Sequence, residues 1–103
     1  AARFRPGRRR EVLEATRALA ALLPVGMPLV QALGAAASVG TGDVRAALGA
    51  VRGRVERGET LADALAAHPA LFPPLYVGLV RAGERSGDLA GAFARLSDQL
   101  DRA

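Results

Sequence analysis

Few side chains in this 103-residue chain are suited to chemistry, and they form no recognised catalytic arrangement. His68 is the only histidine and cysteine is absent, so neither a pair of imidazoles nor a thiolate could bind a metal. The serines lie in no Gly-x-Ser-x-Gly nucleophile motif. His68 precedes Pro69 at the end of a predicted helix, where it is expected to interact with the last helical carbonyl groups. We therefore predict no catalytic residue, no metal, no cofactor and no enzymatic activity.

Two pairs of carboxylates are spaced closely enough to be considered as cation ligands. Glu84 and Asp88 form one pair, and Glu59 and Asp63 form the other. Cations that prefer oxygen need several converging ligands, and two carboxylates alone specify no geometry. Asp88 is better explained by the positive start of a helix that follows it. We therefore interpret these carboxylates as structural.

The basic charge of the chain is concentrated at its start. There is no lysine, so all 14 basic side chains are arginines and no Gly-Lys-Ser or Gly-Lys-Thr phosphate loop exists. Residues 11–103 hold nine arginines against ten acids, whereas five arginines precede them. These five are Arg3, Arg5, Arg8, Arg9 and Arg10. We predict a basic arm or linker over residues 1–10, which could also bind nucleic acid or anionic lipid, and a single domain over residues 11–103.

Composition indicates an all-α fold. Alanine supplies much of the 50% hydrophobic fraction, whereas aromatic residues make up only 4% of the chain. We predict six short helices, with short connections that favour antiparallel neighbours in a compact bundle. They cover about 11–23, a segment from Pro28 to the loop at Gly40, 43–57, a segment from Thr60 to Pro69, 73–83, and a segment from Ser86 or Gly87 to about Leu100.

The third and sixth predicted helices carry the clearest apolar pattern, with spacings of four, three and four residues. The apolar positions are Val44, Leu48, Val51 and Val55 in the third helix, and Leu89, Phe93, Leu96 and Leu100 in the sixth. We place six of them in the core: Leu48, Val51, Val55, Leu89, Phe93 and Leu96. Thr60 is predicted to cap the fourth helix, with Asp63 completing a capping box.

Residues 18–42 contain no charge over 25 positions, which is long enough to span a bilayer. However, Pro24, Gly26 and Pro28 lie in the first half, and most of the remainder is alanine or glycine. We therefore interpret this stretch as two short helices joined by a Pro/Gly turn.

Ordered motif fragments run through residues 58–89. Thr-Leu and Ala-Leu are followed by His-Pro-x-Leu-Phe-Pro and then by Ala-Gly-Glu-x-Ser-Gly-x-Leu. The residues are Thr60, Leu61, Ala64, Leu65, His68, Pro69, Leu71, Phe72, Pro73, Ala82, Gly83, Glu84, Ser86, Gly87 and Leu89. Further residues upstream belong to the same pattern, in the first predicted pair of helices. They are Leu19, Leu22, Leu23, Gly26, Pro28, Leu29, Ala32 and Leu33. Over about residues 15–100, the chain resembles the cytoplasmic repeat of the type II secretion system F family, which includes pilus platform proteins.

The resemblance implies a function in assembly. The parent protein would contain two such domains and several membrane helices, and would lie in the bacterial inner membrane. It would form a platform between a cytoplasmic assembly ATPase and the growing pilus or pseudopilus. This chain would be one helical domain at the cytoplasmic face, with the ATPase and other inner-membrane components as partners and no nucleic acid. A homo-oligomer is a further state that the resemblance allows.

The motif formed by Ala82, Gly83, Glu84, Ser86 and Gly87 has a physical interpretation of its own. Gly83 would let two helices cross closely or let the backbone turn. Ser86 would cap the sixth helix, and the Glu84 carboxylate would accept backbone N–H groups in the turn between the fifth and sixth helices. Two roles remain open for this motif, a structural turn and a surface for partner docking.

A small DNA-binding domain is the alternative function. The short fourth and fifth helices follow an arginine-rich arm, as in some helix-turn-helix proteins. However, residues 74–80 offer almost no polar side chain that could read base edges. Affinity for DNA would fall steeply with salt and would show some preference among sequences.

Overall fold

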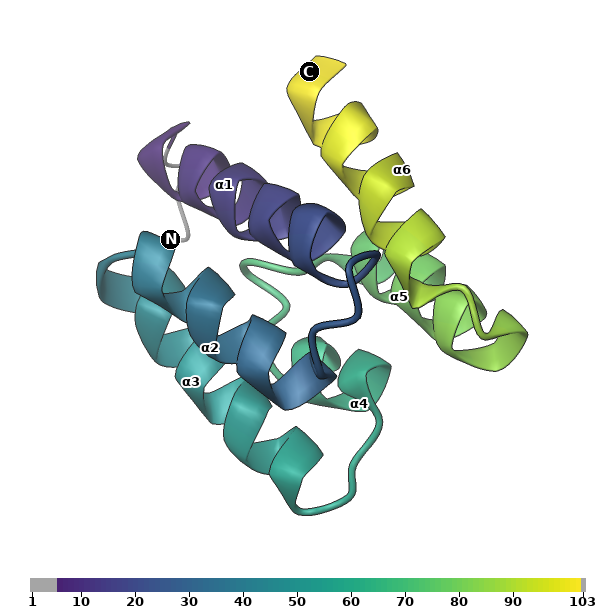
Figure 1. Ribbon diagram of the computed structural model, residues 1–103. Helices are drawn as coiled ribbons and strands as arrows, with labels where there is room; N and C mark the ends of the chain where they lie inside the picture. Colours follow the sequence, from purple (N-terminus) through teal and green to yellow (C-terminus); the bar gives the residue numbers. More distant parts are fainter. Residues whose placement is uncertain (1–5, 103) are drawn as a thin grey trace.

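A computed structural model describes residues 6–102, and this range consists of six α helices and no strand (Figure 1). The all-α prediction is therefore confirmed. The helices are α1 (Pro6–Leu22), α2 (Leu29–Val39), α3 (Gly42–Glu56), α4 (Leu61–Ala66), α5 (Pro74–Ser86) and α6 (Leu89–Arg102).

The helices form a closed circuit. Each helix packs against the next one in the chain, and α6 returns to pack against α1. Helices α2 and α3 lie side by side as a hairpin, while the short α4 lies between α3 and α5 (Figure 1). The radius of gyration is 12.3 Å, close to the value of about 13 Å expected for a compact domain of this length. Every described helix thus contacts at least two others around one core, and α1 and α3 also contact each other.

The apolar positions of α3 and α6 face that core. Leu48, Val51, Phe93 and Leu96 are buried, as predicted from their spacing. Val55 and Leu89 were placed in the core as well, but they are half-buried and pack against its edge. Both lie at a helix end, where fewer neighbouring helices cover a side chain.

An aromatic cluster fills the centre. The ring of Tyr76 lies 5.1 Å from that of Phe72 and 6.3 Å from that of Phe93, in tilted and edge-on arrangements. The Tyr76 hydroxyl lies 2.7 Å from Oγ1 of buried Thr16, which itself donates to the Val12 carbonyl. Because the Thr16 hydrogen is used in that bond, Tyr76 is the donor. Burial raises the pKa of Tyr76, so this hydroxyl keeps its proton and its hydrogen bond.

Helix α1 begins earlier than the predicted position near Glu11. Its first residue is Pro6, and proline suits the first helical position because the missing N–H would have no helical partner there. Arg8 Nε lies 3.6 Å from Asp43 Oδ2, and Arg9 Nη2 donates to the Leu100 carbonyl at 3.3 Å. Residues 8 and 9 therefore contact the folded domain, contrary to a solvated linker. Residues 1–5 lie outside the described residues, so a basic arm there stays a prediction.

The uncharged stretch 18–42 is divided between two helices, as interpreted from the sequence. Gly26 adopts a positive φ of 91°, and the Met27 N–H donates to the Leu22 carbonyl at 3.3 Å. This turn separates α1 from α2. None of the helices within residues 6–102 combines the length and the apolar character needed to cross a bilayer.

The burial of Leu48 leads to a prediction about stability. Leu48 is 1% exposed, so Leu48→Ala should lower the free energy of unfolding by about 2–5 kcal/mol through lost burial and an unfilled cavity. Leu75→Ala provides the control, because Leu75 is 67% exposed and its truncation should change the value by less than about 0.5 kcal/mol. Urea unfolding measures both variants, and equal losses would contradict the assigned core.

Candidate functional site

The motif predicted as a turn or docking site lies at the junction of α5 and α6. Helix α5 extends to Ser86 and α6 begins at Leu89, so this junction lies three residues later than predicted. Gly87 ends α5 in the left-handed conformation, with φ at 75°. The N–H groups of Gly87 and Asp88 both donate to the Gly83 carbonyl. The last turn of α5 is thereby closed and the chain reverses into α6.

Gly83 sets how closely the two helices approach. It is buried, and a Cβ at this position would lie 2.7 Å from the Ala92 Cβ and 3.1 Å from the Asp88 carbonyl oxygen. Real Cβ atoms do not approach so closely, so a side chain here would push α6 away. Close crossing is therefore the reason for glycine at this position. Ala82, by contrast, is exposed.

The Glu84 carboxylate connects α5 to α4. Its Oε2 accepts from the Leu61 N–H at 2.8 Å, and its Oε1 accepts from the Ala62 N–H at 3.0 Å. Glu84 was predicted to accept backbone N–H groups in the turn between α5 and α6, and that location is wrong. The free N–H groups at the start of α4 are the partners of this carboxylate because α4 packs directly against α5.

The start of α4 is completely hydrogen-bonded. In addition to the two bonds to Glu84, Thr60 Oγ1 accepts from the Asp63 N–H at 3.1 Å and the Thr60 carbonyl accepts from the Ala64 N–H at 3.0 Å. Thr60 is thus the predicted cap. The Asp63 carboxylate does not complete a capping box and instead pairs with Arg81 at 2.9 Å. Half of the cap therefore comes from a different helix.

Asp88, and not Ser86, caps α6. Ser86 was predicted to cap α6, but it is the last residue of α5 and its Oγ donates to the Gly83 carbonyl at 3.4 Å. Asp88 Oδ1 accepts from the Gly91 N–H at 3.0 Å and so caps α6. The expectation that Asp88 lies at the positive start of that helix is confirmed.

The four carboxylates considered as cation ligands point to separate partners. Glu84 contacts α4 and Asp88 contacts α6, while Glu59 pairs with Arg54 at 3.1 Å and Asp63 with Arg81. Within residues 6–102, no three His, Asp or Glu residues are grouped as a metal would require.

His68 closes the end of α4 through its backbone. Its N–H donates to the Leu65 carbonyl at 3.0 Å, and its own carbonyl accepts from Leu71 and Phe72. The described part of the chain shows no hydrogen bond of the imidazole. Among the described residues, a helix-end carbonyl is thus contacted by the His68 backbone, and the predicted side-chain interaction is not observed.

A second carboxylate that joins two helices was not predicted. Glu11 Oε1, in α1, accepts from both the N–H and the hydroxyl of Thr41, at 2.6 and 2.5 Å. Thr41 immediately precedes α3. The bond from the Thr41 hydroxyl, followed by that from its N–H, lowers the pKa of Glu11. The stabilisation is therefore complete above the ordinary carboxyl pKa and is lost as the pH falls through the lowered one. No local sequence signal marks a partner 30 residues away.

Comparisons with known proteins add family information to this geometry. The family model for type II secretion system protein F matches residues 15–103. The type IV pilus assembly protein PilC of Myxococcus xanthus is 40% identical over 89 residues, which cover 85% of this chain and 21% of that protein. The type II secretion system protein F of Vibrio cholerae is 43% identical over 87 residues, covering 84% of this chain and 21% of that protein. The chain thus spans about a fifth of the length of these curated relatives.

The close crossing at Gly83 can be tested within one helix. Gly83→Ala should lower the free energy of unfolding by about 1–3 kcal/mol, because its Cβ would overlap Ala92 and the α6 backbone. Gly78→Ala is the matched control, since Gly78 lies in the same helix and a Cβ added there would meet no atom within 4 Å. That variant should be more stable than the parent by up to about 1 kcal/mol. Thermal unfolding that ranks the two variants in the opposite order would contradict the close crossing.

The Glu84 bridge leads to a separate prediction. Glu84→Ala leaves the Leu61 and Ala62 N–H groups without acceptors, and should destabilise the domain by about 1–3 kcal/mol. Hydrogen exchange of these two amides should accelerate more than that of amides in α2. Glu56→Ala, on the exposed side of α3, controls for the loss of a glutamate. Unchanged stability together with unchanged exchange at Leu61 would show that the bridge does not hold α4.

Proposed function

The chain belongs to the type II secretion system protein F family, and from this membership we propose that it is a scaffold domain of an inner-membrane platform. In this proposal, the domain lies at the cytoplasmic face of the membrane and couples a cytoplasmic assembly ATPase to the assembly of a pilus or pseudopilus. The observation that carries the proposal is the family match over residues 15–103.

The names of the relatives support a role in assembly but divide between two machines. Relatives from Vibrio cholerae and Pseudomonas aeruginosa are type II secretion system proteins F, and that of Myxococcus xanthus is a type IV pilus assembly protein. Identities of 37–43% do not separate the two groups. The proposed function is therefore the feature that they share, which is the assembly of a secretion or pilus machine.

A scaffold must keep its shape when a partner binds, and the closed circuit of helices supports this requirement. Helix α1 is joined to the start of α3 by Glu11, and α5 is joined to the start of α4 by Glu84. Exposed polar side chains on α3, such as Arg52 and Glu56, supply a surface for other components. A single domain should bind weakly, because many copies acting together in an assembly can replace affinity with avidity.

The proposal includes the absence of nucleotide hydrolysis by this domain. It rests on the sequence, which has no lysine and no phosphate-binding loop, and on the dispersal of the described carboxylates. Hydrolysis would then belong to the partner ATPase.

The test is a binding measurement between the purified chain and the cognate assembly ATPase at low and moderate salt. We expect saturable binding that weakens with salt, and no release of phosphate by the chain alone. Arg52→Glu should weaken an interaction made through the exposed side of α3, whereas Val25→Ala, in the α1–α2 turn, serves as the control. Binding of duplex DNA is measured in the same way, as the test of the alternative function. Sequence-selective DNA binding without ATPase binding would replace the platform proposal with the DNA-binding alternative.

A further inference from the structure

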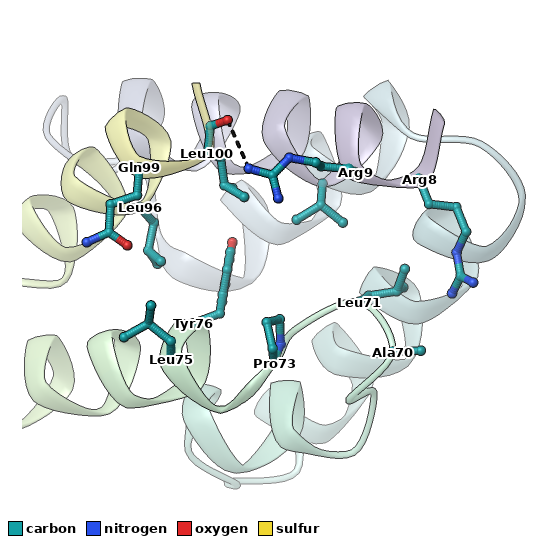
Figure 2. A pocket seen from close by; sticks show the side chains of 11 residues that line it. Arg8, Arg9, Ala70, Leu71, Pro73, Leu75, Tyr76, Leu96, Gln99 and Leu100 are labelled. Atoms are coloured by element: carbon teal, nitrogen blue, oxygen red, sulfur yellow. Dashed lines mark hydrogen bonds between the residues drawn. The ribbon is translucent and has the colours of Figure 1, made fainter. Parts of the chain in front are cut away.

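An apolar groove opens between α1 and α5 (Figure 2). Both helices neighbour α6 in the circuit, and the side chain of Tyr76 in α5 reaches Thr16 in α1, but within the described residues the two backbones do not lie side by side. The space between them is about 420 Å³. Val12, Tyr76 and Leu96 contribute to its lining, and all three are buried residues of the core. The groove thus lies over the core, and the loop between α4 and α5 adds Ala70, Leu71 and Pro73 to its wall.

The rim of the groove combines one exposed apolar side chain with positive charge. Leu75, the second residue of α5, is 67% exposed and stands at the edge of the groove (Figure 2). Among the described residues, the charged ones in the lining are Arg8 and Arg9, and no carboxylate joins them. Arg9 reaches across to the Leu100 carbonyl through one nitrogen, whereas Arg8 is paired with Asp43 of α3. The groove therefore favours an anionic group next to apolar ones.

A second hollow continues the groove toward α3. It measures about 450 Å³ and shares Arg8, Ala70 and Leu71 with the first. Its far side is formed by α3, where Asp43 lies 3.6 Å from Arg8 Nε. Because Asp43 already offsets the charge of Arg8, Arg9 is the better partner for an incoming carboxylate. Two adjoining hollows beside an arginine suit a ligand that presents separate apolar side chains and a carboxylate, rather than one continuous chain.

We propose that this groove binds a helical segment of another protein, with apolar side chains on one face and a carboxylate beside them. A helix lying along the groove would cover Leu75 and the buried floor, and its carboxylate would pair with Arg9. The proposal goes beyond the scaffold function and does not depend on it, since it follows from the shape and charge of the groove.

Two other occupants fit the surface less well. The exposed large apolar side chains among the described residues are Val25, Val39 and Leu75, and of these only Leu75 lies on a helix away from its last residue. A second copy of this chain thus offers no helical face of apolar residues beside a carboxylate within the described range. A membrane surface would need several protruding apolar residues around the arginines, and the described rim supplies Leu75 alone.

The test uses a synthetic amphipathic peptide of about 14 residues, long enough for marginal helix formation, with leucines on one face and glutamates beside them. Its fluorescence anisotropy is measured against the full chain. A peptide of the same pattern with lysine in place of every glutamate reports the charge preference. We expect saturable binding of the acidic peptide, at least about tenfold tighter than that of the lysine peptide.

Three variants of the chain locate the binding site. Leu75→Asp and Arg9→Glu should each weaken binding of the acidic peptide at least about tenfold. Val25→Asp should leave it unchanged, because Val25 is 77% exposed and lies in the α1–α2 turn away from the groove. Amide shifts in NMR spectra of the unsubstituted chain should concentrate near Leu71, Leu75 and Gln99. Circular dichroism verifies that each variant is folded.

Several results would overturn the proposal. Equal binding of both peptides, or binding that Leu75→Asp leaves intact, would remove the groove as the site. A dimer in sedimentation experiments that Leu75→Asp dissociates would assign the groove to a second copy. Binding to vesicles containing anionic lipid that depends on Arg9, without peptide binding, would assign it to a membrane. None of these results bears on ATPase binding, so failure here is distinguishable from failure of the proposed function.

Discussion

The fold depends on how the free N–H groups at the start of a very short helix are satisfied. Helix α4 has six residues, too few for its internal hydrogen bonds to hold it. The Glu84 carboxylate accepts from the first two N–H groups, and Thr60 accepts from the next two. Because α4 is the element that lies between α3 and α5 in the closed circuit, loss of this cap should weaken the packing of α4 against α5.

The glycines beside Glu84 set the geometry of the junction between α5 and α6. Gly83 lets α6 approach α5 closely enough for Ala92 to pack against the backbone, and Gly87 turns the chain at the end of α5. Both oxygens of Glu84 are engaged by backbone N–H groups. This geometry favours the structural role of the motif over docking. The two surfaces proposed for partners, the exposed side of α3 and the groove between α1 and α5, lie elsewhere.

Periodic patterns predicted the helices well because apolar spacing reflects local geometry. The four-three-four spacing in α3 and α6 identified Leu48 and Phe93 as core residues, whereas Val55 and Leu89 are only half-buried because helix ends have fewer neighbours. Partners distant in the chain could not be predicted in this way. Glu84 was correctly expected to accept backbone N–H groups, but its partners lie 22 and 23 residues earlier and become neighbours only when α4 packs on α5.

The contacts of the arginines at the start of α1 could not be predicted from the sequence either, because their partners are also distant in the chain. A cluster of arginines resembles a solvated arm when only their charge is considered. Arg8 instead meets Asp43, and Arg9 meets the Leu100 carbonyl, 91 residues away.

The cross-helix cap of α4 has a further consequence, for the order of folding. Two of the acceptors at the start of α4 belong to Glu84, so this helix has its full cap only when α5 is packed beside it. During synthesis Glu84 follows the segment 61–66 by 18 or more residues, so we expect this segment to gain its full stability late.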